Sequence, residues 1–207
     1  DHREELYAFT NGTIVVDYQN TLENAILLIK GDKIINVGQG IAIPQGSIVI
    51  DLKGNYIYPS FIDLYTQYGL KKEKKDSDEN IFVQSEQYSS LTKGAYNGNE
   101  AIKSEFNAAE HFSIDNEKAK TLREKGFGAV VLFRNDGLAR GTSALVTLGS
   151  KSDNDVMIND FASANYSFTK GSSKQLYPIS QMGYISVLEQ TFLNAEWYAS
   201  QSPPPFI

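Results

Sequence analysis

The sequence predicts a mixed α/β protein whose N-terminal part is all-β. In residues 1–58, short apolar runs alternate with Gly, Pro, Asn and Asp, a pattern typical of small β-domains. After residue 59, a helix-forming segment precedes an apolar strand, which is the order of a βα unit. Pro59 separates the two parts because proline fixes φ and has no N–H to donate to a neighbouring strand. We therefore expect domains at residues 1–58 and 59–201.

The first part should be a small antiparallel β-sandwich, because its short strands are divided by regular turn signals. Within the first segment, Asn11-Gly12 predicts a tight hairpin, since both residue types tolerate a positive φ. The expected strand segments are residues 6–17 (two strands around Asn11-Gly12), 25–30, 33–37 and 47–52.

The second part should contain both helices and strands. Asp115 is a predicted N-cap for a helix at 116–125, and Gly126 is its expected stop. Apolar residues at gaps of three and four predict an amphipathic, core-facing helix formed by Met182, Ile185, Leu188, Phe192, Ala195 and Ala199. The other expected elements are strands at 61–65 and 128–133, a helix at 100–110, and a hairpin of 144–148 with 156–168.

Two further segments are predicted to be irregular. Residues 70–99 are polar and contain Gly94 and Gly98, so a long loop is expected, either a lid or a disordered excursion. Residues 202–207 include Pro203-Pro204-Pro205 and indicate an exposed linker or a cut end.

Composition narrows the classes of function. With 41% hydrophobic residues in a chain of 207, a substantial core is possible. A net charge of -6 argues against a nucleic-acid partner, and the lysines at 71, 72, 74 and 75 are interrupted by acidic residues. No apolar run approaches the roughly 20 residues needed to span a membrane. There is no cysteine, which excludes disulfides and thiolate metal ligands and fits an exported bacterial protein.

Two segments resemble the amidohydrolase superfamily of metal-dependent hydrolases, in particular imidazolonepropionases. They are Lys53–Leu64, which reads KGNYIYPSFIDL, and Ile29–Gly38, which reads IKGDKIINVG. The resemblance implies that the sandwich is followed by a TIM-type (β/α)8 barrel whose first strand is 61–65. It also implies hydrolysis of a carbon-nitrogen, non-peptide bond in a small cyclic or amide substrate, with water activated by a divalent metal that is usually zinc.

At the end of that strand the sequence departs from the family pattern. The family has two histidines, separated by one residue, where this chain has Tyr65-Thr66-Gln67. A phenol and a carboxamide are not among the usual zinc ligands. We therefore predict no cofactor, no metal ligand and no catalytic residue in this chain, although the resemblance implies an orienting role for Asp63 next to such a metal.

A second group of candidates follows the expected strand at 128–133. Arg134 and Arg140 stand in a glycine-containing segment, residues 134–143, that is either a tight loop or a ligand loop. At the carboxyl end of a barrel strand they would contact substrate. The predicted pocket is therefore Asp63, Tyr65, Gln67, Arg134 and Arg140. Of the two histidines, His2 is expected to lie in a frayed terminus. His111 is expected to be an exposed or capping side chain.

The length of the chain bears on its function. A complete (β/α)8 barrel needs about 250 residues, so the barrel is expected to be incomplete here. The remainder of the same polypeptide, or a second chain, would complete both sandwich and barrel. Two hypotheses stay open: the N-terminal portion of an amidohydrolase-type hydrolase with a small-molecule substrate, or a non-catalytic scaffolding or binding module beside an active amidohydrolase module.

Overall fold

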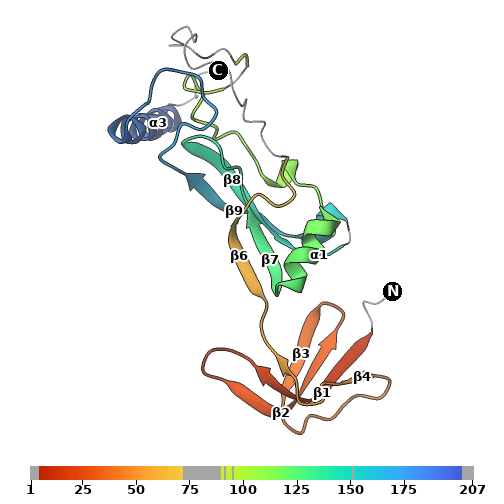
Figure 1. Cartoon of the computed structure of the whole chain (residues 1–207). Helices are drawn as coiled ribbons and strands as arrows, with labels where there is room; N and C mark the ends of the chain where they lie inside the picture. The colour runs from red at the N-terminus through yellow and green to blue at the C-terminus, as the bar shows by residue number, and fades with distance from the viewer. Residues whose placement is uncertain (1–4, 72–89, 91, 95, 151, 202–207) are drawn as a thin grey trace. The chain divides into compact units, whose positions relative to one another are not determined.

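A computed structural model describes residues 5–71, 90, 92–94, 96–150 and 152–201 (Figure 1). The chain divides into two compact units, residues 1–60 and 61–207. His2, most of the predicted loop at 70–99 and the proline-rich end lie outside the described residues. Within the described ranges, no helix is both long and apolar enough to cross a bilayer.

The first unit contains a single mixed sheet in its described part. Its strands are β1 (Leu6–Val15), β2 (Thr21–Lys30), β3 (Lys33–Gly38), β4 (Ile48–Asp51) and β5 (Tyr56–Ile57). Their order is β3-β2-β1-β4, with β5 also paired to β1. The prediction of an antiparallel sandwich is wrong, because β4 and β5 both run parallel to β1. The chain passes from β3 to the far side of β1 before β4 begins, so a hairpin cannot form there.

The predicted hairpin at Asn11-Gly12 is also wrong, since β1 continues through these residues. Asn11 has the expected positive φ, 54°. This conformation produces a bulge, marked by a register shift against β2 between Phe9 and Gly12. Glycine is needed at position 12 because an added Cβ would lie 2.7 Å from the carbonyl oxygen of Asn55. The backbone that follows β4 therefore lies too close to position 12 for any residue other than glycine.

The second unit has a four-stranded sheet in the order β6-β7-β8-β9. The strands are β6 (Phe61–Thr66), β7 (Phe127–Leu132), β8 (Ala139–Thr147) and β9 (Met157–Tyr166). β6 and β7 are parallel, and the other two pairs are antiparallel. The predicted strand at 61–65, the strand at 128–133 and the hairpin are confirmed. β8 begins earlier than expected, so residues 139–143 are strand rather than loop.

Helix α1 (Asn116–Glu124) confirms its predicted cap and stop. The Asp115 carboxylate accepts the backbone N–H of Lys118 at 3.0 Å, and this hydrogen bond lowers the pKa of the carboxyl. Gly126 ends the helix with a φ of 90°. Ala119 is the buried residue of α1 and packs in the main core of the unit, with Val130, Leu132, Ala144, Val146 and Leu148.

The predicted helix at 100–110 is wrong. This segment is a series of turns that ends in the 3-10 helix η2 (Ala109–His111). Ile102 and Asn107 instead form isolated bridges with Ala139 and Thr142 of β8. The segment is instead committed to the part of β8 that β7 does not reach, so tertiary pairing outweighs local helix propensity.

Helices α2 (Asp153–Val156) and α3 (Gln181–Ser200) complete the second unit. The prediction of a helix at α3 is confirmed, but its predicted core-facing side is wrong: Met182 is 76% exposed. The residues that pack against the small cluster of Ala101, Ile102, Leu138 and Ala139 are Tyr184, Val187 and Leu188. Of the six residues that were predicted to face the core, only Leu188 belongs to the group that packs against this cluster.

Candidate functional site

The carboxyl ends of β6 and β7 meet at one place in the second unit. The backbone N–H of Phe133 donates to the carbonyl oxygen of Thr66 at 3.1 Å. The ring of Tyr65 packs against that of Phe133, with 4.6 Å between centroids. Ligand sites in parallel α/β structures lie at the carboxyl ends of strands, so a ligand site is expected here.

The candidate residues of β6 do not form a metal site. The carboxylate of Asp63 accepts the N–H of Tyr65 at 2.9 Å and so bonds to its own strand. Tyr65 is 68% exposed, and Gln67 is exposed just beyond the strand. A phenol that rests on a phenylalanine and a carboxamide do not fit a divalent metal. Among the described residues, no group of three or more His, Cys, Asp or Glu side chains is arranged to hold one.

Arg134 is held by contacts within the protein. Its Nη2 lies 3.5 Å from Oδ2 of Asp136. Its guanidinium also stands over the ring of Phe106, 5.0 Å from the centroid, in a cation–π contact. The sequence placed Arg134 correctly after a parallel strand, but these contacts give it a structural role.

The partner of Arg134, Asp136, is the buried centre of an ionic cluster. Asp136 is 6% exposed and pairs with the Nζ of Lys103. It accepts two further hydrogen bonds, from the N–H of Ser172 at 2.6 Å and from its hydroxyl at 2.7 Å. Burial alone would raise the pKa of Asp136, but the hydrogen bonds from Lys103 and Ser172 outweigh it and the pKa is lowered.

This ionic cluster, Lys103, Arg134, Asp136 and Ser172, joins three loops that are far apart in sequence. The turn that carries Ser172 is close-packed on Asp136, since a Cβ at Gly171 would overlap its carboxylate. Sequence reasoning missed Lys103, Asp136 and Ser172. Asp136-Gly137 stood within the segment singled out, but no spacing could have linked it to residues 33 and 36 positions away.

Arg140 occupies a different setting from the one predicted. It lies in β8, is 8% exposed, and donates from Nε to the carbonyl oxygen of Gly137 at 3.2 Å. Arg134 therefore stands in the loop of residues 133–138, and Arg140 contacts that loop from β8. Only Arg134 is paired with a carboxylate among the described residues.

His111 fits the prediction of an exposed or capping side chain. Its Nδ1 lies 2.9 Å from the carbonyl oxygen of Asn107, one turn earlier. Its ring stacks on that of Phe106 with 4.6 Å between centroids. The geometry gives it a role in the turn, and it has no carboxylate partner among the described residues.

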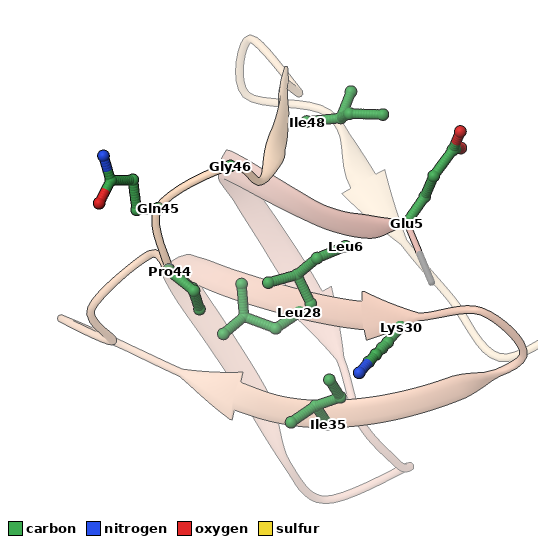
Figure 2. A pocket seen from close by; sticks show the side chains of 9 residues that line it. All are labelled: Glu5, Leu6, Leu28, Lys30, Ile35, Pro44, Gln45, Gly46 and Ile48. Carbon is green, nitrogen blue, oxygen red and sulfur yellow. The ribbon is translucent and has the colours of Figure 1, made fainter. Parts of the chain in front are cut away.

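A separate hollow of about 500 Å³ lies in the first unit (Figure 2). Leu6 and Leu28 turn into it, whereas Gln45 turns away (Figure 2). Its lining is Glu5, Leu6, Leu28, Lys30, Ile35, Pro44, Gln45, Gly46 and Ile48. The side chains at its centre are aliphatic, so it offers apolar contact and no arrangement for catalysis.

Comparison with known proteins identifies the fold. No family model matches the sequence, and no curated protein does. The chain is similar to the crystal structure of an amidohydrolase from Thermotoga maritima MSB8, with a TM-score of 0.70 and 20% identity over 95% of this chain. It therefore has the fold of part of an amidohydrolase structure, and it spans 49% of that protein's length.

A second amidohydrolase structure shares 32% identity with this chain over a shorter stretch. The match covers 28% of this chain and 14% of that one, and its TM-score is 0.27. A likeness of this size carries no argument about fold or function.

Proposed function

We propose that this chain is the N-terminal portion of an amidohydrolase-type hydrolase acting on carbon-nitrogen, non-peptide bonds, with its first-strand metal ligands lost. The fold match over 95% of the chain carries the proposal. The parallel pairing of β6 with β7 supports it, because the segment that resembles the family's first barrel strand ends beside a second parallel strand. An imidazolonepropionase-like subtype, with a small cyclic or amide substrate, remains part of the proposal.

Under this proposal the chain contributes part of the fold around the active site but no reacting groups. Tyr65 and Gln67 occupy the positions of the usual ligands, and Asp63 bonds to its own strand. Any metal that activates water in the whole protein would take its ligands from outside these 207 residues. A small-molecule substrate would then be bound jointly by this portion and by the ligand-bearing one.

The ring contact between Tyr65 and Phe133 favours a second candidate function. A strand end closed by an aromatic pair, Tyr65 with Phe133, suits a scaffolding or binding module. Such a module would stand beside an active amidohydrolase module and contribute contacts but no chemistry. The two candidates differ in whether substrate touches this chain.

Both candidates call for a partner that covers the outer strands of the second unit. β6 is an edge strand, and Ile62 and Leu64 are 56% and 71% exposed. At the other edge, Phe161 of β9 is 61% exposed. Apolar edge strands attract further strands. We propose that the remainder of the same polypeptide, or a second chain, pairs with them.

Protein purified without chelator is expected to contain far less than one zinc per chain, because Tyr65 and Gln67 replace imidazoles. Elemental analysis by mass spectrometry measures this content directly. The matched variant carries Tyr65→His and Gln67→His at two exposed positions and should retain more zinc than the parent. One firmly held zinc per parent chain would contradict the proposed loss of ligands.

A further inference from the structure

We propose that Arg140 is the anchor of a binding site for a small oxyanion, the carboxylate or phosphate group of a small molecule. The site is formed by Arg140 and by the polar residues of β9 beside it, Ser163, Asn165 and Ser167. It does not depend on hydrolase activity. If the proposed function holds, it also gives the substrate a negative charge.

The first argument is the burial of a charge without a counter-charge. Arg140 is 8% exposed, yet no carboxylate in the described ranges lies within 4.0 Å of its nitrogens. Nε donates to the carbonyl oxygen of Gly137, which leaves the four N–H groups of the guanidinium end without a described protein acceptor. A buried guanidinium is normally paired, and a bidentate oxyanion matches the geometry of these donors.

The second argument is the polar surface beside Arg140. Asn165 donates to the carbonyl oxygen of Gly141, the residue after Arg140, at 3.4 Å, so Asn165 lies across from this part of β8. Ser167 donates to the same Gly137 carbonyl oxygen, at 2.7 Å, that Arg140 contacts. Ser163 donates to Asn165 at 3.3 Å.

These three residues follow one another at every second position of the chain, which gives a row of hydroxyl and amide groups. Ser163 is exposed, and Asn165 and Ser167 are half-buried, so solvent reaches this row. Ser167 and Asn165 already donate to the carbonyl oxygens of Gly137 and Gly141, so Arg140 is the group that would hold the anion.

The two half-buried cations nearby, Lys103 and Arg134, do not compete for the same ligand. Lys103 and Arg134 both pair with Asp136, which also accepts a hydrogen bond from the hydroxyl of Ser172. Arg140 is separated from this ionic cluster by Gly137, the residue whose carbonyl it contacts. Within the described residues, Lys103 and Arg134 therefore share the carboxylate of Asp136, whereas Arg140 has no carboxylate partner.

Thermal unfolding of the 207-residue chain in phosphate, in succinate and in chloride at equal ionic strength tests the proposal. Phosphate or succinate should raise the unfolding temperature above the chloride control, since a ligand that binds only the folded chain stabilises it. Arg140→Met should remove this rise and weaken the apparent affinity at least about tenfold, because it deletes charge-assisted hydrogen bonds. The arm with the larger rise identifies the preferred oxyanion.

Two controls make the result decisive. Lys120→Gln removes an exposed positive charge from α1 and should keep the full rise, which excludes a general effect of net charge. Arg140→Met in chloride should unfold no earlier than the parent, because it removes an uncompensated buried charge. The proposal is overturned if neither anion stabilises the parent, if the rise persists in Arg140→Met, or if that variant is already destabilised in chloride.

Discussion

Asp136→Asn is expected to lower the free energy of unfolding by about 3–5 kcal/mol, because it leaves the half-buried Lys103 and Arg134 beside a neutral amide. Urea unfolding at neutral pH, followed by circular dichroism, measures the loss. Asp160→Asn is the matched control: Asp160 lies exposed on β9, and its substitution should change the stability by less than about 0.5 kcal/mol. Equal losses in the two variants would contradict a central role for the ionic cluster.

The same carboxylate should make the chain sensitive to acid. Its pKa in the folded chain lies below the ordinary value, so its contribution is fully present above the unfolded pKa of about 3.9. The contribution is lost as the pH falls below that value and through the folded pKa. Asp136→Asn should therefore lose less stability than the parent between neutral pH and pH values below about 4, a comparison that the same unfolding experiment provides.

Gly141→Ala is expected to cost about 3 kcal/mol, or to prevent folding of the second unit. An added Cβ would overlap the carbonyl oxygen of Phe106, and the φ of 76° is unfavourable for any residue with a side chain. That carbonyl also accepts the N–H of Thr142 at 2.9 Å, so it cannot move without breaking a hydrogen bond.

Gly126→Ala separates the two causes of this loss. Gly126 has a similar φ of 90°, but its added Cβ would stand 3.4 Å from the ring of Phe61, an ordinary contact. This variant should lose only the backbone part, about 1 kcal/mol. If Gly141→Ala were no worse than Gly126→Ala in the same thermal or urea unfolding, the close packing of residues 101–108 against β8 would be refuted.

The features that the sequence predicted well have short-range causes. The cap at Asp115 and the stop at Gly126 depend on hydrogen bonds and dihedral angles within one helix. β6 was predicted from an apolar run that begins just after Pro59, whose effect on the backbone is local. These signals are contained in a few consecutive residues, so the sequence is enough to read them.

The features that were missed depend on partners distant in the chain. Asn11-Gly12 has the backbone of a turn, but the approach of Asn55 makes it a bulge. The segment at 100–110 loses its helix to pairing with β8. For the candidate site, Arg134 and Arg140 were placed near a parallel strand end, whereas the cluster that pairs Arg134 joins Asp136 to Lys103 and Ser172 across three loops.

The central proposal is that these 207 residues are one portion of a larger amidohydrolase-type protein, and that a partner covers their exposed strand edges. Size-exclusion chromatography with light scattering measures the mass of the isolated chain in solution and tests this claim most directly. The account predicts association beyond a single chain of 23.0 kDa, through the exposed apolar edge at β6. A stable, soluble monomer of 23.0 kDa over a wide range of protein concentration would contradict it.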